Sequence, residues 1–195
     1  MQCKRYAVTR DADFTTRAED GRLYIDGYFA VYNSRYGLWE GAYETIAPGA
    51  FDGETEGDVR ALTNHDTTLV LGRTTAGTLT LRLDERGLWG SIEVNQADQD
   101  AMNTYERVKR RDVTQCSFGF DILDQEVTYA DGEPTVWTIR RVKLYEVSVV
   151  TFPAYQDTSV EARRQDFEAL KKRRAEAWKA GALDKLRAAA GVDTK

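Results

Sequence analysis

The chain contains a single histidine, His65, in the polar segment TNHDTT directly after the expected strand DVRAL. Imidazole is the side chain whose charge changes near neutral pH, which suits it to moving protons during catalysis. Loops at strand ends often carry catalytic groups. If this protein uses imidazole chemistry, His65 is therefore the candidate. An ordinary surface histidine is the alternative that this pattern leaves open.

The segment QCSFGFDI, residues 115–122, predicts a strand with two different faces. Because alternate side chains of a strand point to opposite sides, one face should pack in the core through Cys116, Phe118 and Phe120. Ser117 and Gly119 then share the other face. There Ser117 would be a rigidly held nucleophile, and Gly119 would let a substrate backbone approach its hydroxyl. An ordinary half-exposed strand with no catalytic role is equally consistent with this sequence.

A third segment, KLYEVSVVTFPAY, is apolar on both faces and predicts a central strand. Strict alternation places Leu144, Glu146 and Ser148 on one face of it. A carboxylate in such a strand is costly unless a donor pairs with it. The candidate donors to Glu146 are Arg140, Arg141, a backbone N–H group and His65, so a structural ion pair stays open beside a catalytic role.

Together these residues supply a nucleophile, one base and a carboxylate, which is the logic of a Ser–His–acid triad. Cys116 is a rival nucleophile, but a reactive thiolate needs an accessible, electropositive site, and its strand face favours packing. Metal chemistry is disfavoured, because zinc sites draw several ligands from His, Cys and carboxylates and this chain has one histidine and no C-x-x-C pair. We expect no metal and no cofactor.

The elements that must position these residues are mostly strands. Residues 1–155 predict many short strands separated by turns, and residues 156–195 predict a helical tail of one or two helices with a break near Gly181. One helix is expected to interrupt the strands at residues 96–112, with Asn95 as its N-cap. Strands of this number and length suggest a closed barrel or a sandwich.

Composition narrows the class of protein. The chain has 195 residues, of which 42% are hydrophobic and 30% charged, and its net charge of −5 reflects an acidic body with a mildly basic tail. An acidic body is a poor nucleic-acid binder. The N-terminal segment has no apolar signal region and no run reaches the roughly 18 apolar residues of a membrane span. We therefore expect an intracellular protein without nucleic-acid or membrane partners.

From Gly27 to Tyr155 the sequence resembles the tailed-phage prohead proteases, the processing enzymes of capsid maturation. The resemblance lies in seven short motifs in matching order, GYFAVYNS, ETIAPGAF, ALTNHD, LGRT, GLWGSIEV, SFGF and LYEVSVVTFPAY. This family is related to the herpesvirus assemblins. The resemblance implies an α+β, mainly β fold, with a small herpesvirus-protease-like β-barrel surrounded by helices.

The resemblance also implies a function. It predicts a serine endopeptidase that acts inside the immature capsid in the host cytoplasm and cleaves the capsid scaffold, or the scaffolding domain of the major capsid protein, and itself. A homodimer is expected by analogy with the assemblins. The competing hypothesis is a non-catalytic assembly or scaffold-binding protein with the same barrel. The basic run Lys171–Arg174 is either a solvated helix face or a site that docks on an acidic scaffold or capsid surface.

The motifs carry His65 and Ser117 over as catalytic residues. The third member is Glu146, with Asp66 as a weaker candidate, because assemblins have a second histidine there and this chain has none. The assemblins also imply an arginine in oxyanion stabilisation, which Arg140 or Arg141 would supply.

Overall fold

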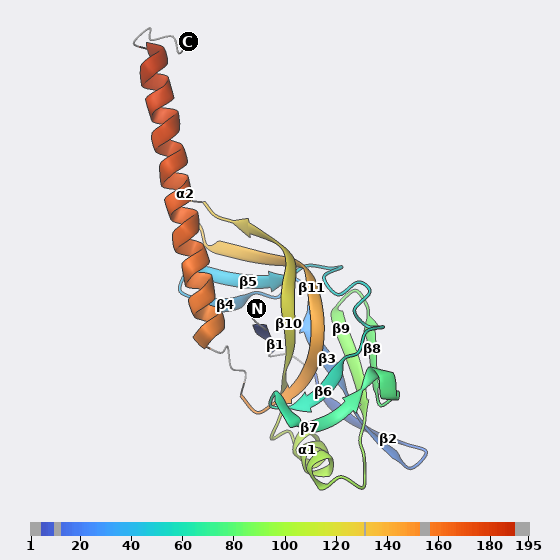
Figure 1. Ribbon diagram of the computed structural model, residues 1–195. Helices are drawn as coiled ribbons and strands as arrows, with labels where there is room; N and C mark the ends of the chain where they lie inside the picture. The colour runs from blue at the N-terminus through green and yellow to red at the C-terminus, as the bar shows by residue number, and fades with distance from the viewer. Residues whose placement is uncertain (1–4, 10–12, 131, 153–156, 190–195) are drawn as a thin grey trace. The chain divides into compact units, whose positions relative to one another are not determined.

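The computed structural model of the protein describes residues 5–9, 13–130, 132–152 and 157–189. The chain divides into two compact units, residues 1–155 and 156–195. The first unit is built mainly of strands and carries one α-helix, and the described part of the second is a single helix (Figure 1). The predicted α+β, mainly β class is confirmed.

The strands form two sheets. The seven-stranded sheet contains β1 (Arg5–Thr9), β4 (Tyr36–Trp39), β5 (Ala42–Ile46), β6 (Arg60–Thr63), β7 (Asp66–Arg73), β10 (Gln115–Thr128) and β11 (Thr135–Val150). The four-stranded sheet contains β2 (Thr15–Glu19), β3 (Arg22–Val31), β8 (Leu79–Leu83) and β9 (Gly87–Glu93), in the order β2-β3-β9-β8. The predicted hairpin in TLTLRLDERGLWGSIEV corresponds to β8 and β9, which pair antiparallel.

Strand β11 organises the larger sheet because three strands pair with it. Along one edge it pairs antiparallel with β10 for nearly its whole length. Along the other edge its first half pairs in parallel with β5, and its second half pairs in parallel with β6. The β6–β7 hairpin and β10 therefore lie on opposite sides of the second half of β11, the half that carries Glu146 (Figure 1).

The expected small β-barrel differs from what the structure contains. The pairings among the described strands give two sheets that do not close into a barrel. The reason for the error is physical: short strands with regular turns are common to barrels and open sheets, and closure depends on pairing between edges that are far apart in the sequence. The expected ring of helices is also missing, since the described part of residues 1–155 holds a single α-helix and the short 3₁₀ turn Thr74–Ala76.

The core is one cluster with contributions from both sheets. Ile25 and Phe29 of β3 belong to it together with Phe118 and Phe120 of β10, and all four are completely buried. The rings of Phe118 and Phe120 lie 4.8 Å apart between centroids. Aromatic side chains of this size contribute a large part of the apolar area that stabilises a domain.

The helix α1 (Gln99–Lys109) is shorter than predicted. Its N-cap is Asp98, whose carboxylate accepts from the backbone N–H groups of Asp100 and Ala101, and not Asn95. Asn95 instead closes the preceding turn by accepting from the N–H of Ala97. Both residue types accept readily at helix starts, so local sequence did not separate them.

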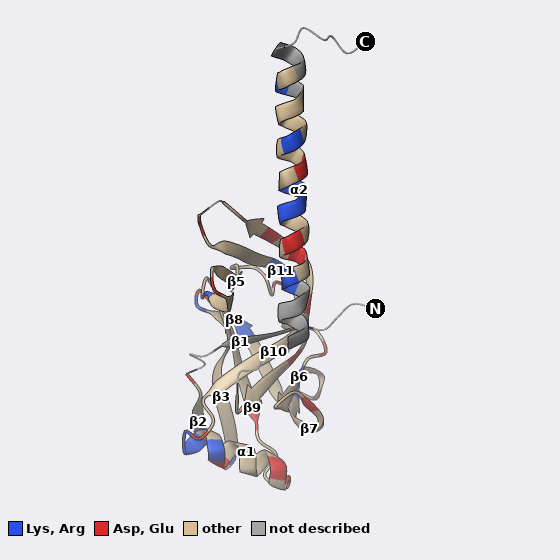
Figure 2. Ribbon diagram, turned by 90° about the vertical axis from the view of Figure 1, so that its left-hand side faces the viewer, with Lys and Arg blue, Asp and Glu red and all other residues tan. Residues whose placement is uncertain are grey.

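The helix α2 (Asp157–Ala189) runs without a break through Gly181, where a break was predicted. A glycine costs only about 1 kcal/mol in a helix interior, which a helix rich in Ala, Glu, Lys and Arg tolerates. Figure 2 shows both basic and acidic residues along it. Within the described residues no helix is long and apolar enough to span a membrane.

Candidate active site

His65 lies in the two-residue turn between β6 and β7. Thr63 pairs with Asp66, so Asn64 and His65 form the loop, and both have positive φ angles of 51° and 61°. Positive φ at both positions defines a type I′ hairpin turn, for which Asn-Gly is the usual choice. A histidine where glycine is preferred costs backbone strain, and such strain concentrates at functional sites.

Asn64 ties this turn to the end of β11. Its backbone N–H donates to the carbonyl of Val149, and its side-chain Oδ1 accepts from the N–H of Thr151 at 2.8 Å. Asparagine also adopts positive φ more readily than most residues. Asn64 therefore supplies the turn conformation and fixes the position of His65 relative to β11.

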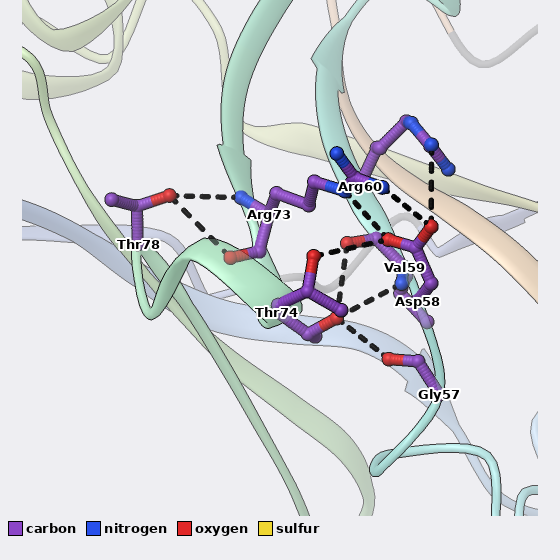
Figure 3. Close-up of polar contacts among 8 residues, drawn as sticks. Gly57, Asp58, Val59, Arg60, Arg73, Thr74 and Thr78 are labelled. Atoms are coloured by element: carbon purple, nitrogen blue, oxygen red, sulfur yellow. Dashed lines mark hydrogen bonds and ion pairs between the residues drawn. The ribbon is translucent and has the colours of Figure 1, made fainter.

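The other end of the hairpin is held by a charged network around Asp58 (Figure 3). The Arg73 guanidinium donates to both carboxylate oxygens of Asp58 at 2.7 Å, and Arg60 donates to Oδ2 at 3.3 Å. The hydroxyl of Thr74 accepts from the N–H of Val59 and donates to the carbonyl of Gly57. The hydrogen bonds from Arg73 lower the pKa of Asp58 to about 2.

We expect Asp58→Asn to lower thermal stability in a pH-dependent manner. Because the pKa of Asp58 falls from 3.8 to about 2 on folding, the carboxylate stabilises the fold fully above about pH 4 and loses this effect as the pH drops through 2. The difference in melting temperature between wild type and Asp58→Asn should thus be constant from pH 5 to 7 and shrink toward pH 2, in melts followed by circular dichroism. A difference that does not shrink would contradict the role of this charge.

A β-bulge in β11 turns Glu146 away from the core. Gly119 pairs with Glu146 and Phe120 pairs with Leu144, so Tyr145 has no opposite residue on β10. The bulge reverses the alternation: Leu144 belongs to the core together with Phe120, whereas Glu146 lies on the face of Gly119. The prediction that Leu144 and Glu146 share a face was therefore wrong, because a bulge inserts one residue.

Two contacts hold the bulge. The backbone N–H of Leu144 donates to Glu54 Oε2 at 2.8 Å, and the hydroxyl of Tyr145 donates to Asp121 Oδ2 at 2.7 Å. This hydrogen bond, followed by partial burial, raises the pKa of the Tyr145 hydroxyl. Bulges recur beside active sites where a side chain has to be re-aimed.

The re-aimed carboxylate of Glu146 meets two donors. His65 Nδ1 lies 2.6 Å from Glu146 Oε1, and the hydroxyl of Ser148 donates to Glu146 Oε2 at 2.6 Å. A carboxylate only accepts, so Nδ1 of His65 is the donor in this contact. The Glu146 side chain is 6% exposed and that of His65 16%, so the pair is strongly shielded from water.

Asp66, the weaker candidate for the acid, is engaged elsewhere. Its Oδ1 accepts from both the N–H and the hydroxyl of Thr68, and these hydrogen bonds lower its pKa. The alternative partners of Glu146 also lie elsewhere. Arg140 is paired with Glu126, and Arg141 is exposed. Glu146 is therefore the carboxylate that contacts His65.

Ser117 lies one strand from Glu146, on the same face. It pairs across β10 and β11 with Ser148, as Gly119 pairs with Glu146, and directly opposite residues of an antiparallel pair share a face. His65 thus lies beyond one edge of β11, in the β6–β7 turn, and Ser117 lies on β10 along the other edge. Ser117 is completely buried in this structure.

Cys116 points to the opposite face, as predicted. It is completely buried in the core, and its Sγ donates to the carbonyl of Tyr28 at 3.0 Å. A buried thiol of this kind behaves as a packing residue, which argues against Cys116 as the nucleophile.

Two further assignments do not coincide with the structure. Gly119 was predicted to leave room for substrate, but a Cβ atom there would lie 2.5 Å from Glu146 Oε1, so the free space is filled by the carboxylate. Arg140 and Arg141 were predicted near the oxyanion. At about 3.3 Å per residue, their positions on β11 lie roughly 15–20 Å from Glu146, and the structure does not bring them to the site.

The positions of His65 and Ser148 both follow from local sequence patterns. An Asn followed by a single loop residue between two strands is typical of a type I′ turn, which would have located His65 in a hairpin loop. Ser148 follows Glu146 by two residues, and strict alternation correctly placed the two on one face, but the sequence assigned Ser148 no role.

Comparisons with known proteins identify the family of the chain. Residues 10–173 match the family of caudovirus prohead serine proteases, and the chain belongs to this family. It is therefore a serine protease of phage capsid maturation. No curated protein matches the chain significantly. Among solved structures, the bacteriophage T4 capsid assembly protease gp21 is similar, with 12% identity over 75% of this chain and 98% of that chain and a TM-score of 0.41.

Proposed function

We propose that the protein cleaves peptide bonds with a triad of Ser117, His65 and Glu146. The observation that carries this assignment is the 2.6 Å contact between His65 Nδ1 and Glu146 Oε1, on the sheet face shared with Ser117. With Nδ1 protonated toward Glu146, Nε2 is the basic atom. His65 is the sole histidine of the chain, so no second imidazole competes for the role.

In the proposed reaction, His65 Nε2 takes the proton of the Ser117 hydroxyl as its oxygen attacks the carbonyl carbon of the scissile bond. The imidazolium that forms is stabilised by the buried carboxylate of Glu146 and then protonates the leaving amine. Water, activated by the same histidine, hydrolyses the acyl-enzyme. The burial of the His65–Glu146 pair strengthens this electrostatic effect relative to water.

The proposed substrates are the capsid scaffold, as a separate protein or as a domain of the major capsid protein, and the protease itself. The proposed place of action is the interior of the prohead. Family membership supports this assignment. The basic residues of α2, Lys171–Arg174, are exposed, and we propose that they dock on an acidic scaffold; Lys171 also pairs with Glu168 at 3.2 Å.

Covalent labelling tests the nucleophile. We expect a small fluorophosphonate to form an adduct that peptide mass spectrometry locates at Ser117. The adduct should disappear in Ser117→Ala and in His65→Ala, because the hydroxyl is nucleophilic only with its base. Capsid or scaffold cleavage by wild type should stop as Ser117 becomes labelled. An adduct on Cys116, or full cleavage by Ser117→Ala, would refute the proposed triad.

A further inference from the structure

The carboxylate of Glu146 is held at both oxygens. Oε1 accepts from His65 and Oε2 accepts from the Ser148 hydroxyl, each at 2.6 Å. Rotation of a carboxylate about its last torsion meets only a broad, shallow preference, so one hydrogen bond would leave its plane free to turn. The second hydrogen bond fixes that plane and keeps Oε1 directed at His65.

Ser148 has little freedom to do anything else. It is completely buried, on β11, between its pairing partners Leu62 of β6 and Ser117 of β10. A hydroxyl has one proton, and that of Ser148 is given to Glu146. A nucleophilic serine instead has to give its proton to the histidine. The geometry distinguishes the two paired serines: the hydroxyl of Ser148 donates to the acid, whereas Ser117 is the serine proposed to give its proton to the base.

Gly119 completes the space around the carboxylate. A Cβ atom at this position would lie 2.5 Å from Oε1 of Glu146 and 3.0 Å from its Cγ, distances that force something to shift. The carboxylate therefore rests against the backbone of β10 on one side and the Ser148 hydroxyl on another. Ser148 and Gly119 together therefore define the space that the carboxylate of Glu146 occupies.

We propose that Ser148 is a positioning residue of the protease, which holds the carboxylate of Glu146 in the plane that orients His65. The inference rests on the proposed function of Ser117, His65 and Glu146. Ser148 acts through Glu146, and it is distinct from the groups that exchange protons with the substrate.

The first test is kinetic. Ser148→Ala should lower kcat for cleavage of the cognate capsid or scaffold protein by about 10- to 100-fold, the effect of one hydrogen bond to a charged group. KM should stay within about twofold, because Ser148 does not bind substrate. Ser148→Cys fills a similar space but donates weakly, so it should show a loss in the same direction with a native fold.

Ser91→Ala is the matched control: Ser91 is a buried strand serine of β9 that pairs with Asp26 and Thr80 and makes no contact with Glu146. It should leave kcat unchanged.

The second test uses the single histidine. Proton and nitrogen NMR of imidazole-labelled protein gives one set of ring signals, and the Nδ1–H proton of a buried His–carboxylate contact should appear far downfield. In Ser148→Ala and Ser148→Cys this signal should move upfield or broaden, whereas in Ser91→Ala it should not change. If both Ser148 variants keep the wild-type kcat and the wild-type Nδ1–H signal, Ser148 does not position Glu146. The same holds if Ser91→Ala changes them equally.

The two proposals can fail separately. Full cleavage by Ser117→Ala would refute the proposed triad. The NMR comparison would still show whether Ser148 orients the Glu146–His65 pair. Conversely, a cleavage-dead Ser117→Ala with an unaffected Ser148→Ala would support the triad and overturn the positioning role.

Discussion

Replacing His65 by glycine is expected to abolish proteolysis and yet leave a more stable protein than replacement by alanine. Removal of the base of a Ser–His–acid triad lowers kcat by roughly 10⁴- to 10⁶-fold, so neither variant should process its substrate measurably. Both variants lose the same contact with Glu146. They differ in the turn: His65 has φ of 61°, a conformation that glycine adopts freely and alanine does not.

The comparison of the two variants isolates the strain of the turn. We expect His65→Gly to unfold at a higher urea concentration than His65→Ala, by about 1 kcal/mol in free energy of unfolding. Asp66→Asn, next in the hairpin, is the activity control and should retain cleavage, because Asp66 accepts from Thr68 and does not contact the imidazole. Measurable cleavage by His65→Gly, or equal stability of the two variants, would contradict this account of the residue.

The β6–β7 turn shows which features of the site could be predicted from the sequence and which could not. The strand DVRAL before Asn64 and His65 was predicted from the sequence pattern, and the histidine was singled out because it is the sole one. Its partner could not be deduced from spacing, because β6 and β11 are brought together by a parallel pairing between residues far apart in the chain. Such pairings depend on how the whole sheet assembles, and no local pattern encodes them.

The rule that strand side chains alternate between two faces was correct for Ser117 and wrong for Glu146. Strict alternation correctly separated Ser117 from the buried Cys116 and Phe118. The same rule put Glu146 beside the core residue Leu144, since it could not anticipate the bulge at Tyr145. That bulge is held by Glu54 and Asp121, distant residues whose contacts arise only in the folded sheet.

The failure to predict that the two sheets stay open also results from contacts between residues far apart in the chain. Individual strands and their hairpins, such as β8 and β9, follow from local alternation and turn residues. Whether sheet edges meet to close a barrel is a property of strand tilt and register over the whole domain. The class of fold was therefore predictable, and the closure was not.

Replacing Glu146 by glutamine is expected to remove most activity without unfolding the protein. Glutamine has nearly the same shape, and its amide can hydrogen-bond with both partners, because the Ser148 hydroxyl either donates or accepts. If the amide nitrogen faces His65, Nδ1 becomes an acceptor and the proton moves to Nε2, where it blocks attack by Ser117. If the amide oxygen faces His65, the tautomer is kept but the negative charge that stabilises the imidazolium is lost.

Either orientation should therefore lower kcat, by about 10³- to 10⁴-fold, the scale seen when the acid of such a triad becomes an amide. Urea unfolding should change little for Glu146→Gln. Glu146→Ala should unfold more easily, because it leaves the buried donors of His65 and Ser148 without an acceptor. The nitrogen shifts of the single imidazole report which tautomer Glu146→Gln adopts, and hence which of the two losses dominates. If Glu146→Gln retains a tenth or more of wild-type kcat while Asp66→Asn does not, the acid of the triad is Asp66 and the His65–Glu146 contact is structural.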